Sequence, residues 1–319
     1  MLLSRVAENL YWAARYLERA EATARVVREH TNLLVDFPTS EALNWEPLLA
    51  IVGGRDDFDD RHDRADEQSI LRFLVADRDN SGSILMSIEH ARENLRTTRE
   101  VLPREVWQAV NDLYLFVASH HGEGVARRSR NRFLEHVVGE VMRVSGILDA
   151  TMSRDEAEEF LRLGRLVERA DMTTRVLDVR AAALLAETDR VGASAFDDVQ
   201  WMSVLRSLSA LQMFHRAMRC AVDGPSTLRF LLFDEQFPRS VAWCIDVIDR
   251  SLVRLPDPDL VRPACRQARA ELASVAVDEL DGDALHTTVD LLQVAIHRIH
   301  DALASTYFLA RATGSVPVT

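Results

Sequence analysis

The chain has 319 residues, of which 47% are hydrophobic and 28% charged. Because it contains only 12 glycines and 9 prolines, it is expected to form long helices and to be an all-α protein. Its net charge of −12 and the lack of a long basic block argue against a nucleic-acid partner, because phosphate binding needs a concentrated positive face. No apolar run reaches the roughly 18 residues of a membrane span, and Arg5 and Glu8 interrupt any secretory leader, so we expect no membrane contact and a cytoplasmic protein.

The first predicted element is a helix with an apolar seam and strongly charged flanks. The seam consists of residues at alternating spacings of three and four, namely Leu10, Ala13, Leu17, Ala20, Ala24 and Val27. The flanks carry Arg15, Glu18, Arg19, Glu21 and Arg25, so the helix is expected to be enclosed by other helices. Within it, Arg15–Glu18 and Glu21–Arg25 have the spacing of intrahelical ion pairs.

Polar motifs follow in the next part of the chain. Residues 77–82, Asp-Arg-Asp-Asn-Ser-Gly, predict a turn before the next helix. In that helix the stretch EHARENLRTTRE is either a solvated face or a patch that binds carboxylates, and it carries Arg92, Glu93, Asn94, Arg96 and Arg99. The basic run at residues 126–132 is expected to open a solvated helix, with phosphate or partner binding as the alternative.

The charged helix is then repeated 150 residues later. Seven of thirteen positions are identical between residues 15–27 and 165–177. The charged positions of the second copy are Arg165, Glu168, Arg169, Asp171 and Arg175, and its seam is Phe160, Leu163, Val167, Ala170, Thr174 and Leu177. A capping box formed by Ser153 and Glu156 is expected to open this second helix.

The similarity extends beyond the two charged helices. Trp45 matches Trp201, and FLVADRDNSGSI at residues 73–84 matches FLLFDEQFPRSV at residues 230–241, where Pro238 suits the first turn of a helix. Residues 187–198 break the helical periodicity and are the expected linker. We therefore predict an internally duplicated helical bundle, with halves at residues 1–150 and 151–319 packed as one compact unit with pseudo-twofold symmetry.

The repeated charges allow a structural and a functional interpretation. In the first, arginines and glutamates form a network that fixes the register between the halves, because buried charges persist only when they are paired. In the second, Arg15, Glu18, Arg165 and Glu168 line a site where paired carboxylates hold a metal or share a proton and arginines clamp a carboxylate or phosphate. No Glu-x-x-His pair accompanies them, and neighbouring arginines would compete with a cation, so no metal is expected.

Histidines and cysteines give no stronger indication of a site. Two groups share helix faces: His286 with Asp290, and His297 with His300 and Asp301. Such spacing can bind zinc, but histidines of this kind are more often simply hydrogen-bonded. The three cysteines lack metal-type spacing, and Cys244 is expected in the core. Because the sequence contains no nucleophile motif, phosphate-binding loop or dinucleotide fingerprint, no cofactor is expected and no catalytic residue is assigned.

Together these motifs resemble the alpha-E domain family of bacterial proteins. The resemblance covers residues 1 to about 308, through LSRVAENLYWAARYLERAEATAR, DRDNSGSI, ARENLRTTREVLP, TMSRDEAEEFLRLGRLVERADMTTR and FPRSVAWC. It implies an all-helical fold. The family's motif residues correspond here to Arg15, Glu18, Arg19, Glu21, Arg25, Asp77, Asn80, Arg92, Glu93, Asn94, Arg96, Arg99, Glu168, Arg169, Asp171, Arg175, Pro238, Arg239 and Ser240.

The resemblance also implies partners. Genes of the family sit beside, or are fused to, a circularly permuted ATP-grasp ligase, and a transglutaminase-like cysteine peptidase often accompanies them. ATP-grasp enzymes activate a carboxylate as an acyl phosphate and join it to an amine. The leading hypothesis is therefore an accessory or substrate-binding subunit of a peptide ligation or modification system, with a peptide at a central Arg/Glu groove. The alternatives are an independent enzyme acting on peptides or amides at that groove, and a purely structural scaffold.

Overall fold

The chain folds into helices throughout the part that the structure describes. The computed structural model describes residues 2–36, 44–181, 195–280 and 282–308, and these ranges contain fourteen α-helices and no strand. The prediction of an all-α fold is therefore confirmed. Most of the expected linker at residues 187–198 lies outside the described residues, and the next helix begins at Ala195.

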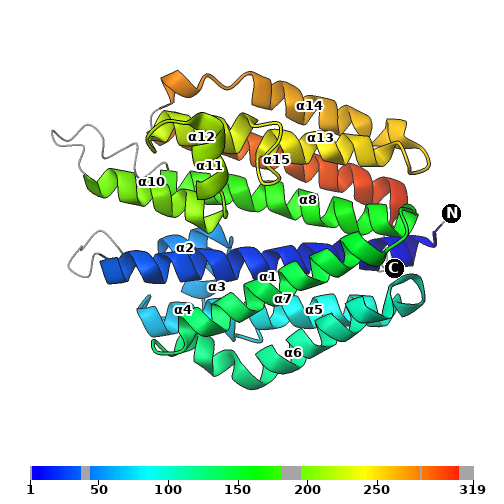
Figure 1. Ribbon diagram of the computed structural model, residues 1–319, viewed down its shortest axis with the longest axis horizontal. Coiled ribbons are helices and arrows are strands. Elements are labelled where there is room, and N and C mark those ends of the chain that lie inside the picture. The colour runs from blue at the N-terminus through cyan, green and yellow to red at the C-terminus, as the bar shows by residue number, and fades with distance from the viewer. Residues whose placement is uncertain (1, 37–43, 182–194, 281, 309–319) are drawn as a thin grey trace, which may run out of the picture.

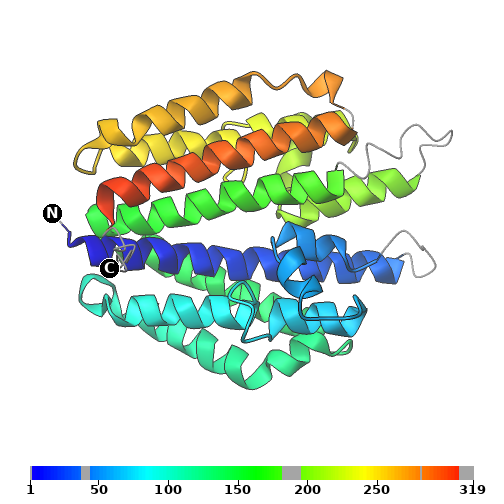
Figure 2. The same ribbon diagram turned by 180° about the vertical axis from the view of Figure 1, so that it is seen from behind.

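Two long helices, α1 (Ser4–Asp36) and α8 (Glu156–Val176), lie side by side through the middle of the molecule (Figures 1 and 2). Both predicted seams are buried, with no seam residue more than 6% exposed. The backbones touch at Gly164, where a Cβ atom would lie only 2.1 Å from the carbonyl oxygen of Tyr11. Only a residue without a side chain allows so close an approach, so Gly164 sets the distance between the two helices.

The helices between α1 and α8 lie mostly on one side of this pair (Figure 1), although α2 contacts α8. They are α2 (Pro47–Ile51), α3 (Arg55–Asp59), α4 (Glu67–Val75), α5 (Ile84–Arg96), the 3₁₀ turn η1 (Arg99–Val101), α6 (Arg104–Val125) and α7 (Arg130–Thr151). Of these, α5 and α7 pack directly on α1.

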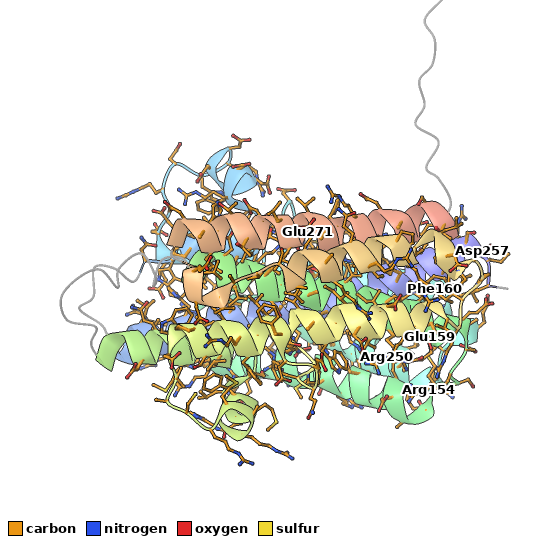
Figure 3. All side chains as sticks on the ribbon, turned by 90° about the horizontal axis from the view of Figure 1, so that it is seen from above. Arg154, Glu159, Phe160, Arg250, Asp257 and Glu271 are labelled. Atoms are coloured by element: carbon orange, nitrogen blue, oxygen red, sulfur yellow. The ribbon has the colours of Figure 1, made fainter. Side chains whose placement is uncertain are left out.

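The helices after α8 pack on the other side. They are the π turn η2 (Leu177–Ala181), α10 (Ala195–Ser207), α11 (Leu211–Met218), α12 (Gly224–Phe233), α13 (Val241–Leu252), η3 (Pro258–Leu260), α14 (Arg262–Ala273), η4 (Val277–Glu279) and α15 (Gly282–Tyr307). Both α13 and α15 pack on α8. Seen from above, Arg154, Glu159 and Phe160 lie near the end of the molecule where α8 begins (Figure 3).

The predicted turn at residues 77–82 leads into α5 through a corner that ends at Ser83, and the matching segment forms a similar corner before α13 that ends at Ser240. Ser83 caps α5 and donates its hydroxyl to the carbonyl of Asp77 at 2.8 Å. Ser240 caps α13 and donates to the carbonyl of Asp234 in the same way. The expected place of Pro238 in a first helical turn is wrong, because α13 begins at Val241, after the serine cap.

The start of α8 also differs from the prediction. Asp155, not Ser153, is the N-cap, and its carboxylate accepts hydrogen bonds from the backbone N–H groups of Ala157 and Glu158. A carboxylate at this position also meets the positive end of the helix dipole. Glu156, the expected partner in the capping box, instead accepts the backbone N–H of Leu2.

The basic run at residues 126–132 is not wholly solvated, contrary to expectation. Arg130, the first residue of α7, is only 2% exposed. Its guanidinium donates to Glu67 at 2.8 Å and to the carbonyl of Val125 at 3.0 Å, and it lies over the ring of Trp45. This arginine therefore satisfies the last carbonyl of α6, that of Val125, from within the core.

Candidate functional site

A reciprocal pair of ion pairs joins α1 to α8 at the centre of the molecule. From α8, Arg169 donates two hydrogen bonds to Glu18, each of 2.9 Å. From α1, Arg19 donates two hydrogen bonds to Glu168, of 2.6 and 3.1 Å. Because the planar guanidinium matches a carboxylate in this two-pronged geometry, each pair fixes orientation as well as charge.

Each glutamate also receives a second arginine. Arg15 donates to Glu168 at 2.7 Å, and Arg239, on the turn before α13, donates to Glu18 at 2.6 Å. The expected intrahelical pair of Arg15 with Glu18 is therefore wrong, because Arg15 bonds across the helix interface. Every oxygen of Glu18 and Glu168 accepts at least one arginine N–H.

The network continues towards the C-terminal end of each central helix. The predicted pair of Glu21 with Arg25 is confirmed, with a shortest contact of 2.6 Å, and Arg239 adds a second hydrogen bond to Glu21 at 2.8 Å. In α8, Arg175 pairs with Asp171 at 2.9 Å. Arg239 thus bridges two carboxylates of α1 from a loop that lies more than 200 residues later in the chain.

Arg165 departs from the expected arrangement. No hydrogen bond or ion pair reaches it within the described residues, and its Nε atom is buried. Beside it is a cavity of about 30 Å³, which is room for about one water molecule, between Arg165, Glu18, Glu158 and apolar side chains of α5 to α8. Glu18 accepts Arg239 at the place where the matching Glu168 accepts Arg15. The nearby Glu158 keeps one buried oxygen without a hydrogen-bond partner.

The electrostatics favour fully charged glutamates. Burial alone would raise the pKa of Glu18, but Arg169 and Arg239 outweigh it and lower the pKa to about 2. Burial likewise opposes ionisation of Glu168, yet Arg19 and Arg15 lower its pKa to about 2. Carboxylates that are 2% and 1% exposed, with such low pKa values, are not suited to share or transfer a proton at neutral pH. The geometry therefore favours the structural interpretation of these two residues.

This arrangement predicts a specific loss of stability in acid. A carboxylate whose pKa is lower in the folded chain stabilises the fold above its ordinary pKa of 4.5, and that contribution disappears as the pH falls towards 2. The urea midpoint should fall across this window, and the Glu168→Gln variant should show a shallower dependence because it lacks one such group. If the urea midpoint fell equally steeply with pH in the two proteins, the low pKa of Glu168 would be contradicted.

The polar set of α5 lies apart from this network. Arg92 donates to Asn111 of α6 at 2.9 Å and to Glu93 at 2.6 Å, and Arg96 donates to Glu93 at 2.7 Å. The guanidinium of Arg99 lies over the ring of Trp107, 4.8 Å from its centroid. These arginines therefore face α6 and solvent rather than the central glutamates. Of the predicted set, Glu93 and Asn94 line an open groove on another face of α5.

That groove, here called the aromatic groove, lies between α1, α5 and α15 and has a volume of about 1170 Å³. Trp12 and Tyr16 of α1, His90 of α5 and His300 of α15 line it. The sequence contained one signal for it, because Trp12 and Tyr16 are four residues apart and so share a face of α1. Nothing in the sequence placed α5 and α15 beside that face.

Two of the three histidines of α15, His286 and His300, are hydrogen-bonded. His300 pairs with the hydroxyl of Tyr11 at 2.9 Å, and burial, followed by the nearby charge of Arg15, lowers the pKa of His300 to about 4. His286 lies between Asp178 and Asp290, close enough for the three to surround an ion. However, a different ring nitrogen faces each carboxylate, which is the geometry of a hydrogen-bonded imidazole. The thiol of Cys244 is buried in the core, as predicted.

Comparison with known proteins gives relatives of similar sequence but larger size. Uncharacterized proteins of Mycobacterium bovis and Mycobacterium tuberculosis are 23% identical over 346 aligned positions, which cover 98% of this chain. The chain spans only 38% of the length of those relatives. No solved structure matches the chain. None of the described helices is long and apolar enough to cross a membrane.

The central ion pairs are formed by two Glu-Arg sequences, Glu18-Arg19 and Glu168-Arg169, each of which bonds to the other. A family model described as a predicted alpha-helical domain with a conserved ER motif matches residues 2–308. The chain therefore belongs to the Alpha-E family.

Proposed function

We propose that this protein is an accessory, substrate-binding subunit of an ATP-grasp-type peptide ligation or modification system in the cytoplasm. Its principal partner is a circularly permuted ATP-grasp ligase, and a transglutaminase-like peptidase is a second candidate partner. One observation carries the proposal: Glu18 and Glu168 are buried and fully occupied by arginines. These glutamates hold the fold together, so the chemistry belongs to the partner.

The same observation disfavours an independent enzyme at the Arg/Glu motif. A general acid or base must reach the proton it transfers and change its charge, whereas Glu18 and Glu168 are bonded to arginines and have low pKa values. A purely structural scaffold would need the network but not an open cavity beside it. The aromatic groove, which runs along α1, supports a binding role.

The greater length of the mycobacterial relatives supports the proposal that this chain acts together with a second protein. In the mycobacterial proteins the matching region is joined to further polypeptide, which makes up the larger part of each chain. A domain that acts together with a second domain is often joined to it in some proteins and separate in others. This supports a partner for the present chain without identifying it.

We also infer that the chain arose by internal duplication. The charged helices α1 and α8 form reciprocal ion pairs, Arg19 with Glu168 and Arg169 with Glu18, as a pseudo-twofold axis between two copies would require. The corners before α5 and α13 use the same serine cap and the same hydrogen bond to an aspartate carbonyl.

Reconstitution with a purified circularly permuted ATP-grasp ligase from the same organism tests the proposed function. We expect the two proteins to co-elute in size-exclusion chromatography. We also expect this protein to increase the rate at which the ligase forms ADP and a ligated peptide, measured by mass spectrometry. The isolated chain should release no product from the same peptides.

An unrelated helical protein at the same concentration serves as the control. Turnover of peptides or amides by the isolated chain would favour the independent enzyme. A ligase that neither binds this protein nor changes its rate would contradict the subunit role.

A further inference from the structure

A continuous row of aromatic rings lines the aromatic groove. The ring of His90 lies 5.1 Å from that of Tyr16, Tyr16 lies 5.6 Å from Trp12, and Trp12 lies 5.4 Å from His300, measured between centroids. The rings come from three helices, α5, α1 and α15, and all four belong to residues that are partly exposed. The faces of such rings carry negative partial charge and attract a cation placed over them.

The rim of the groove is acidic. Glu8, Glu93 and Asp301 line it, and Arg5 is the lining residue with a permanent positive charge. Arg92 and Arg96 already bond to Glu93. Among the described residues, the carboxylate of Glu8 forms no ion pair, and that of Asp301 forms one, with His297 at 3.6 Å. Two carboxylates beside the aromatic wall therefore remain available to a cation.

Two arginines of the central network also contact these rings. The guanidinium of Arg15 lies 5.0 Å from the Trp12 ring, and that of Arg19 lies 5.7 Å from the Tyr16 ring. Both arginines donate to Glu168, and neither lines the groove. The network therefore restrains the two rings that line the groove.

We propose that the aromatic groove binds a peptide through a positively charged side chain, a lysine ammonium or an arginine guanidinium, placed against Trp12 and Tyr16 and between Glu8 and Asp301. A volume of about 1170 Å³ accommodates the neighbouring residues of the peptide as well as the charged side chain. The role of the bound peptide rests on the proposed function, in which it is the amine-bearing substrate of the partner ligase. The binding itself requires no ligase.

Two blocked tripeptides, one with a central lysine and one with acetyl-lysine in its place, test the proposal on the isolated protein. Titration at low ionic strength is followed by NMR through the indole N–H of Trp12. We expect the lysine peptide to shift this signal and to bind about tenfold more tightly than the acetyl-lysine peptide, which lacks the charge. In the Glu8→Gln/Asp301→Asn variant the lysine peptide should bind about tenfold more weakly.

Asp290→Asn provides the matched control, because it removes one exposed charge from the same helix, α15, outside the groove. It should bind the lysine peptide as the unmodified protein does, and circular dichroism should show all variants folded. Equal affinity for the two peptides, an unshifted Trp12 signal, or equal losses in both variants would overturn the proposal. Because no ligase is present in this experiment, such a failure would not contradict an interaction with the ligase. Conversely, a ligase that does not respond to this protein would not contradict peptide binding in the groove.

Discussion

Replacing Gly164 by alanine is expected to destabilise the fold by about 3 kcal/mol or more. The added Cβ atom would lie 2.1 Å from the carbonyl oxygen of Tyr11, which is backbone and cannot rotate away. Relief requires α1 and α8 to move apart, and that movement would also stretch the ion pairs between them. Urea denaturation followed by far-UV circular dichroism measures the effect.

Gly146→Ala is the matched control, since this glycine lies inside α7 and a Cβ atom added to it would meet no neighbouring atom within 4 Å. Alanine is the better helix former, so the control should gain about 1 kcal/mol. A Gly164→Ala protein that unfolds at the same urea concentration as the Gly146→Ala protein would show that the two central helices are not in backbone contact.

The Glu168→Gln substitution should lower the free energy of unfolding by about 3–5 kcal/mol. It keeps the shape of the side chain but leaves Arg15 and Arg19 without their counter-charge in a site where the glutamate is only 1% exposed. The remaining amide can accept hydrogen bonds but cannot offset the positive charges of the buried Arg15 and the partly buried Arg19. The urea midpoint at neutral pH reports the loss.

Glu93→Gln is the comparison for this change, because Glu93 also accepts two arginines but its side chain is 44% exposed. Solvent screens such pairs, so we expect a change within about 0.5 kcal/mol. Similar small effects at both positions would mean that burial does not strengthen the central network, and the structural interpretation of Glu168 would fail.

Features that depend on local sequence were predictable. The seams of α1 and α8 follow from the spacing of apolar residues, and Ser83 and Ser240 cap the next helices because serine favours that position. The ion pair of Glu21 with Arg25 lies within one helical turn and was predicted correctly. The cap of α8 was nevertheless predicted wrongly, because Asp155 and not Ser153 takes the N-cap position.

Features that depend on the arrangement of helices were not predictable. Arg15 has carboxylates within reach on both its own helix and α8, and only the interface decides that Glu168 receives it. Arg239 comes from a distant loop to bond Glu18, whereas the matching Glu168 accepts Arg15 of α1, so the two copies of the motif are completed differently. The aromatic groove likewise exists because α5 and α15 meet α1 on one face, which no single stretch of sequence encodes.

The crossed ion pairs have a consequence for the order in which the chain folds. The counter-ions of Arg15 and Arg19 are supplied by α8, and those of Glu18 by α8 and the loop before α13. Because α1 precedes α8 in the chain, its central charges lack these partners until residues 168 and 169 have been synthesised. We therefore expect the N-terminal helices to stay partly open during synthesis, and α1 to complete its packing only after the later helices have formed.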